Sequence, residues 1–137
     1  MYVRFGERGG ETCRCKAVRR SATYSIDIEL YLACHLNAGG GKYSLVEYCY
    51  NAGQLTREIA KIMADNFKSR LGTSEGKVIE IPQGGRGEVC IEATRPPALI
   101  MEPLFMDNDT HLHIAVEKYD AIAMAIVGAV KSYNEGR

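Results

Sequence analysis

Net charge, long apolar runs and ordered cysteine spacing are all missing from this sequence, and each absence excludes a class of protein. Its 17 Lys and Arg residues balance its 17 Asp and Glu residues, so no overall field favours a nucleic-acid partner. No apolar run approaches the length that spans a bilayer, and the segment 1–7 has no apolar signal core. We therefore expect synthesis in the cytoplasm without a signal peptide, and neither a membrane nor a nucleic-acid partner.

The cysteines exclude a disulfide scaffold and a zinc finger. There are 5 of them, an odd number, and they do not have zinc-finger spacing. Three lie in apolar, strand-like runs, which favours buried thiols made in a reducing compartment: Cys34, Cys49 and Cys90. Cys13 and Cys15 form a C-x-C pair that could bind metal or pair as thiols, although surface or packed thiols are the commoner interpretation.

The length and composition predict one domain. A chain of 137 residues with 46% apolar content can bury a substantial core, and we find no internal repeat, low-complexity tract or linker in it. We divide the domain 1–137 into a basic N-terminal arm, 1–21, and a core, 22–137. A short basic run of this kind is typical of a solvated terminus, and contact with an anionic polymer is the alternative.

Apolar periodicity predicts alternating strands and helices. Helical spacing predicts an amphipathic helix over Gln54–Leu71, which Gly72 ends, and a long helix over Ile114–Tyr133. Strand-like runs are Ser25–Leu36, Tyr43–Tyr50, Lys77–Ile81, Val89–Ile91 and Ala98–Met101, with a glycine-rich loop at Pro82–Gly87. Because the run Ala98–Met101 is continuously apolar, we expect it to be buried on both faces, as in an α/β layer fold.

Two segments place a chemically competent side chain at the end of a predicted strand. His35 lies in the sequence CHLNAGGG, and Glu102 lies in RPPALIMEPLFMDN. Active-site groups of parallel sheets collect at such strand ends. An imidazole that can hold a metal and a carboxylate that can move a proton are the minimum set for metal-assisted hydrolysis. The structural alternatives are a packed core histidine and a carboxylate held in a salt bridge.

These segments resemble a known family when they are read in order. The sequence CHLNAGGG, Glu47 within SLVEYCY, the helix Gln54–Leu71, RPPALIMEPLFMDN and the last helix resemble the zinc-dependent N-acetylmuramoyl-L-alanine amidases, and most closely the amidase domains of bacteriophage endolysins. The resemblance covers roughly Ala17–Tyr133 and matches the C-terminal two thirds of the family domain. It implies an α/β fold with a mixed, mainly parallel sheet and helices on both faces.

The resemblance also implies a reaction and its residues. The family cleaves the amide between the lactyl group of N-acetylmuramic acid and the first L-alanine of the peptidoglycan stem peptide. By position in the family motifs, His35 corresponds to a zinc ligand and Glu102 to the catalytic carboxylate. Asn37 would shape the loop, and Glu47 would orient a ligand or the substrate. The partner would be bacterial peptidoglycan, reached at the cell wall if the protein is released.

The chain departs from the family in its first part. A histidine in a glycine-rich turn and a glutamate on the following helix, both zinc ligands in the family, are not found, so the chain resembles an amidase domain without its N-terminal βαβ portion. Because a catalytic zinc normally has three protein ligands, this predicts weak or absent zinc binding and an uncertain activity. His111 and His113 could supply replacement ligands, although their position ahead of a helix is more typical of a cap.

Two hypotheses of function and one of assembly follow. The chain is either a peptidoglycan amidase or a non-catalytic wall-binding or assembly subunit that retains the amidase scaffold. In both cases, missing strands would expose a sheet edge and apolar helix faces. We therefore expect a homo-oligomer, most simply a dimer, or a complementing N-terminal fragment. The arm Met1–Ser21 could reach across and add a strand to a neighbour's sheet.

Overall fold

The computed structural model describes residues 30–92, 94 and 96–135. The basic arm 1–21, the C-x-C pair and the first part of the strand predicted from Ser25 lie outside the described residues. Within the described part of the chain, no helix is long and apolar enough to cross a membrane.

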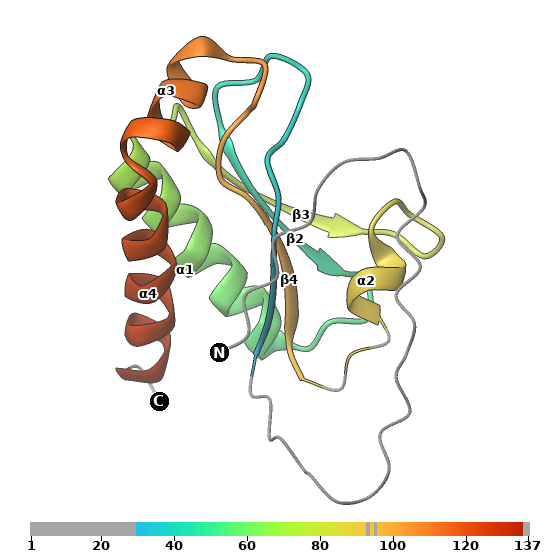
Figure 1. The fold of residues 1–137 in the computed structure, drawn as a ribbon. Helices are drawn as coiled ribbons and strands as arrows, with labels where there is room; N and C mark the ends of the chain where they lie inside the picture. Colours follow the sequence, from blue (N-terminus) through green and yellow to red (C-terminus); the bar gives the residue numbers. More distant parts are fainter. Residues whose placement is uncertain (1–29, 93, 95, 136–137) are drawn as a thin grey trace, which may run out of the picture.

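Among the described residues, four strands form one mixed sheet in the order β1-β4-β2-β3 (Figure 1). β1 runs parallel to β4, β2 runs parallel to β3, and the two pairs meet where β2 and β4 are antiparallel. The strands are β1 (Tyr31–Cys34), β2 (Ser44–Cys49), β3 (Gly76–Ile81) and β4 (Ala98–Glu102). The predicted mixed α/β sheet is therefore confirmed, and the first four residues of β4 are buried as expected.

The helices lie on both faces of the sheet (Figure 1). α1 (Gln54–Leu71) and α4 (Tyr119–Glu135) pack together on one face, and α2 (Glu88–Glu92) lies on the other. α1 coincides with the predicted helix, and it ends because Gly72 adopts the left-handed conformation, with φ of 70°. The larger core lies between this helix pair and the sheet, around Phe67 and Met63.

Two predicted elements are wrong in type or extent. The segment Val89–Ile91 belongs to the helix α2 rather than to a strand, because a run of three residues is too short for side-chain propensity to decide the conformation. The long C-terminal helix begins earlier, as α3 (Asp109–Glu117), and breaks at Lys118 before α4. The early start has a local cause, since the side chain of Asn108 accepts the backbone N–H of His111 and caps α3.

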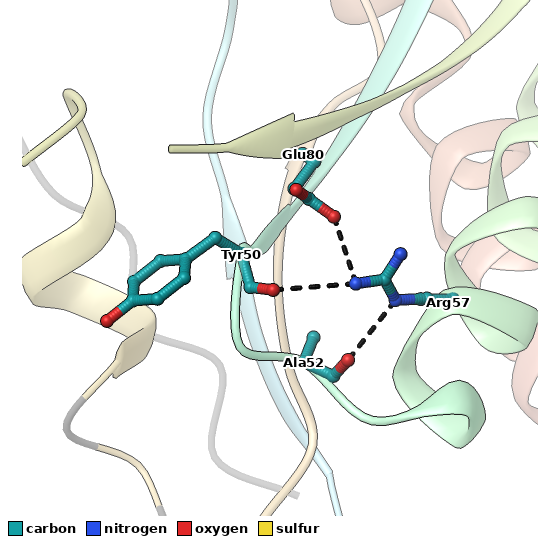
Figure 2. A network of polar contacts seen from close by, with 4 residues as sticks. All are labelled: Tyr50, Ala52, Arg57 and Glu80. Atoms are coloured by element: carbon teal, nitrogen blue, oxygen red, sulfur yellow. Dashed lines mark hydrogen bonds and ion pairs between the residues drawn. The ribbon is translucent and has the colours of Figure 1, made fainter. Parts of the chain in front are cut away.

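A polar network joins β2, α1 and β3 at the start of α1 (Figure 2). The Arg57 guanidinium pairs with Glu80 of β3 at 3.0 Å and donates to the carbonyl oxygens of Tyr50 and Ala52 at 3.4 and 3.2 Å. It also lies 5.1 Å from the ring centre of Tyr48. Because it satisfies two carbonyls of the β2–α1 turn, we interpret this network as structural.

Candidate functional site

The sheet brings His35, Glu102 and Glu47 together on one face. The antiparallel register pairs Leu45 with Glu102 and Glu47 with Ile100, and residues paired across strands point to the same face. Ile100 and Glu102 are two residues apart in β4, so both carboxylates lie on the face that carries α2. His35 follows β1 directly, and its N–H donates to the carbonyl oxygen of Met101 at 2.8 Å, which places it beside Glu102.

The two carboxyl groups are half-buried and interact with each other and with their neighbours. Burial raises the pKa of Glu102, while the charges of His35 and Arg86 lower it to a smaller extent. Burial also raises the pKa of Glu47, the charge of Glu102 raises it further, and Arg86 lowers it. A carboxyl group whose pKa is raised by burial, beside an imidazole, is suited to take and return a proton.

Arg86 is part of this site and was not identified from the sequence. It is exposed in the loop between β3 and α2, and its charge acts on both Glu47 and Glu102. The only sequence signal is the surrounding run of glycines, Gly84, Gly85 and Gly87, which predicts a loop but not the sheet face over which that loop folds.

The two segments singled out in the sequence are bonded to each other at the end of the sheet. The N–H of Asn37 donates to the carbonyl oxygen of Leu104, and the carbonyl oxygen of Asn37 accepts the N–H of Met106, at 2.8 and 2.9 Å. The Asn37 side chain accepts the N–H of Ala38 at 2.7 Å, and its role in shaping the loop stays a prediction. Asn37 therefore fixes the backbone that carries His35 relative to the backbone that carries Glu102.

Asp107, which sequence reasoning did not select, completes this connection. One oxygen of its carboxylate accepts the N–H groups of Gly39 and Gly40 at 2.6 and 3.0 Å. The side chain of Asn108 donates to the carbonyl oxygen of Gly41 at 3.0 Å. The glycine loop is thus held against the segment after β4 by side-chain bonds that only the tertiary structure reveals.

His111 and His113 do not join His35 in a common cluster. His111 is buried, and its Nδ1 accepts the backbone N–H of Phe105 at 3.0 Å. Burial lowers the pKa of His111, which favours the neutral ring that this hydrogen bond requires. His113 is exposed on α3. Their role as alternative metal ligands stays a prediction.

Cys34 and Cys49 are free thiols. Cys49 is buried, as predicted, while Cys34 is only partly buried, next to His35. Burial raises the pKa of the Cys34 thiol, so the thiolate form that binds metal or attacks substrate is disfavoured there.

The described residues do not fit a complete zinc site. In residues 30–92, 94 and 96–135, no group of three or more His, Cys, Asp or Glu side chains is arranged to hold a metal ion. A catalytic zinc normally has three protein ligands and an open fourth position. His35 can contribute one imidazole to such a site, and we derive no catalytic step through a metal.

The candidate site is separate from the hollow near the start of α1. A hollow of about 330 Å³ does exist near the start of α1, lined by Cys49, Thr56 and Ile91 among others. His35, Glu47 and Glu102 do not line it. The chemistry and the hollow are therefore separate features.

Comparison with solved structures identifies the fold. An N-acetylmuramoyl-L-alanine amidase from Clostridium difficile 630 superposes with a TM-score of 0.66 at 23% identity, over 80% of this chain. The chain has the fold of N-acetylmuramoyl-L-alanine amidases. The CwlD amidase of Clostridioides difficile, solved in complex with the GerS lipoprotein, gives a TM-score of 0.69 at 18% identity over 82% of this chain. The catalytic domain of an endolysin targeting Clostridia difficile gives 0.64 at 22% identity over 79%.

The chain matches only part of these amidases. It spans 59%, 58% and 57% of the three matched chains, respectively. No protein-family model matches the sequence, and no curated protein matches it at a significant level. The shared feature is therefore the three-dimensional arrangement of the sheet and helices.

Proposed function

We propose that this protein acts on peptidoglycan as an N-acetylmuramoyl-L-alanine amidase. The observation that supports this proposal is the position of His35 and Glu102 at adjacent ends of two parallel strands, in a fold shared with such amidases. Catalytic groups gather at the carboxyl ends of parallel strands, because the loops that follow converge there. The resemblance to endolysin amidases extends the proposal to a wall-degrading protein of bacteriophage origin that acts once it reaches the cell wall.

In the proposed mechanism, Glu102 carries the proton. It takes a proton from water as the water oxygen attacks the carbonyl carbon of the scissile amide, and it then gives that proton to the departing amine nitrogen. Burial raises the pKa of Glu102, which brings its two protonation states closer in free energy near neutral pH. Glu47 lies next to it on the same face and would orient the substrate.

The direct test measures bond cleavage in purified cell walls. Incubation with the protein and zinc should release new L-alanine amino termini, and Glu102→Gln should reduce that release by about 100-fold or more. Glu117→Gln, which removes an exposed carboxylate from α3, is the matched control and should retain activity. Cleavage that continues at the same rate in Glu102→Gln would remove this mechanism.

We propose His35 as one ligand of a Zn²⁺ ion, although the described residues alone do not form a group of three or more metal ligands. When bound, zinc would polarise the amide carbonyl and lower the pKa of a coordinated water. Metal analysis of the purified protein tests this assignment. Zinc that disappears in His35→Ala supports it, and stoichiometric zinc that survives this change contradicts it.

The second candidate function is a wall-binding or assembly subunit without catalysis. The missing three-ligand group in residues 30–92, 94 and 96–135 favours it. Sedimentation with purified walls separates the two candidates. Binding without any new amino termini, in the presence of zinc, supports the subunit, and cleavage that depends on Glu102 supports the amidase.

A further inference from the structure

The loop Pro82–Glu88 holds Arg86 near the two carboxyl groups of the site. Two backbone N–H groups bond within the loop, since Gly85 donates to Pro82 and Glu88 donates to Gly85 at 2.8 and 3.2 Å. The buried carboxylate of Glu88 accepts the N–H of Gly84 at 2.6 Å and closes the loop. Such bonding restricts the loop to few conformations, so Arg86 is presented from a defined backbone.

The position of the loop follows from Gly87. Its φ is 94°, which favours glycine, and a Cβ atom there would lie 2.9 Å from Cδ1 of Ile100. Ile100 is paired across the sheet with Glu47 and is two residues from Glu102 on the same face. Gly87 therefore packs against Ile100 and Ile81, and the charge of the preceding residue, Arg86, acts on both carboxyl groups.

Arg86 is available to bind a ligand. It is exposed, and within the described part of the chain no carboxylate lies close enough to form an ion pair with it. Lys77, another cation on this face, is already engaged, because its Nζ lies 3.8 Å from the Tyr43 ring centre and 3.8 Å from Glu75. A guanidinium offers a planar pair of donors that matches a carboxylate.

We propose that Arg86 recognises a carboxylate of the stem peptide, and that the peptide runs across the sheet from Glu102 toward the β3–α2 loop. This inference deepens the proposed function and takes the identity of the ligand from it. The order across the face is His35 directly after β1, Glu102 on β4, Glu47 on β2 and then the loop that follows β3. The scissile amide lies over Glu102, and an acidic residue next to the first alanine reaches Arg86.

A binding experiment tests this without requiring catalysis. The probes are N-acetyl-L-alanyl-D-glutamate and its uncharged diamide, titrated into the full chain and followed by NMR. The acid should bind about 10-fold more tightly than the diamide, because one charge-assisted hydrogen-bonded pair contributes about this much affinity. Arg86→Gln should abolish this preference, and Arg86→Lys should retain part of it. Lys61→Gln removes an exposed charge from α1, on the opposite face, and should leave the preference unchanged.

Gly87→Ala provides a second variant that keeps the arginine but displaces the loop. It should also lose the preference, because the added Cβ meets Ile100 and the left-handed φ disfavours alanine. Equal binding of acid and diamide, no binding of either, or a preference that survives in Arg86→Gln would each overturn the proposal. Inorganic phosphate that competes as strongly as the acid would also overturn it, since the site would then bind any anion.

The outcome can be separated from that of the proposed function. Binding that depends on Arg86, combined with walls that stay uncleaved, leaves this inference standing and removes the amidase. Cleavage that depends on Glu102 but responds equally to acidic and amidated stem peptides leaves the amidase standing and removes the role of Arg86.

Discussion

At the scale of single residues, the candidate site holds two carboxyl groups where burial disfavours their charged form. Glu47 and Glu102 are half-buried on one face, and burial raises the pKa of both above their ordinary value of about 4.3. The folded protein therefore holds these protons at pH values where the unfolded chain has released them. The contribution to stability of each carboxyl group falls as the pH rises from about 4.3 through the folded-state pKa.

Glu102→Gln should therefore stabilise the fold while it removes the proposed activity. At pH 7 we expect a gain of at most about 1 kcal/mol, because solvent screens part of the unfavourable burial. The gain should shrink toward pH 4, because wild-type Glu102 becomes increasingly protonated in both states. Urea midpoints at pH 4 and pH 7 measure this difference. A loss of stability at pH 7 would mean that the carboxylate is held by favourable contacts instead.

His111 should make stability sensitive to mildly acidic pH. Its Nδ1 accepts the N–H of Phe105 only when the ring is neutral, and burial lowers its pKa below the ordinary value of about 6.5. The unfolded chain then binds this proton more tightly, so stability falls as the pH drops below about 6.5 and levels off below the folded-state pKa. Urea midpoints between pH 7.5 and 5 follow this effect.

The two histidines of α3, one buried and one exposed, provide the matched comparison. His111→Gln should flatten the dependence on pH and lower stability at pH 7.5, whereas His113→Gln should leave both unchanged because its side chain is exposed. An identical pH slope in wild type and His111→Gln would assign the effect to other groups.

At the scale of elements, the site depends on close contact between two loops. The glycine loop after β1 and the segment after β4 are joined through Asn37, Asp107 and Asn108. Gly41 lies against the ring of Phe105, and Phe105 is buried and packs edge-on to Tyr43. The ring therefore has little space to move aside.

Gly41→Ala should displace this connection, because its Cβ would overlap the Phe105 ring. We expect a loss of about 1–3 kcal/mol of stability from overpacking, and reduced wall cleavage because the backbones carrying His35 and Glu102 shift relative to each other. Gly53→Ala is the control, since a Cβ there meets nothing within 4 Å at a backbone angle suited to alanine. Thermal unfolding of both variants tests the expectation. Equal melting temperatures would show that the loop can relax.

At the scale of the whole molecule, β1 and β3 are the outer strands of the described sheet. All four residues of β1 are only partly buried, and Val78 and Ile79 of β3 are exposed. Outside the sheet, the helices α3 and α4 carry Val116, Tyr119 and Met124, whose side chains are more than half exposed. Edge strands and apolar surfaces of this kind favour association with another chain.

We therefore propose that the full chain forms a homo-oligomer, most simply a dimer. Light scattering at micromolar concentration should give about twice the monomer mass of 15.1 kDa, and the unfolding midpoint should rise with protein concentration. A monomer mass with unfolding independent of concentration contradicts the dimer. Addition of a separate N-terminal amidase fragment that restores zinc binding would instead support a complementing partner.

Local sequence determined most of the elements. The apolar spacing of α1 and the glycine after it define that helix from end to end, because periodicity and a left-handed stop act within a few residues. The buried run of β4 and the position of Glu102 at its end also follow from the sequence. Local patterns failed at α2 and at Lys118, because a segment of a few residues carries too little periodicity to decide its conformation.

The assembly of the site was decided by tertiary structure. His35 and Glu102 could be selected from the sequence because their motifs resemble a family, but their proximity depends on β1 pairing with β4, across more than sixty residues of chain. Arg86 and Asp107 had no comparable signal, since an exposed arginine and a loop aspartate are common in any soluble protein. The register of the paired strands and the packing of the loops bring these two residues to the site. Such contacts between distant segments depend on the whole fold and leave no periodic pattern in the local sequence.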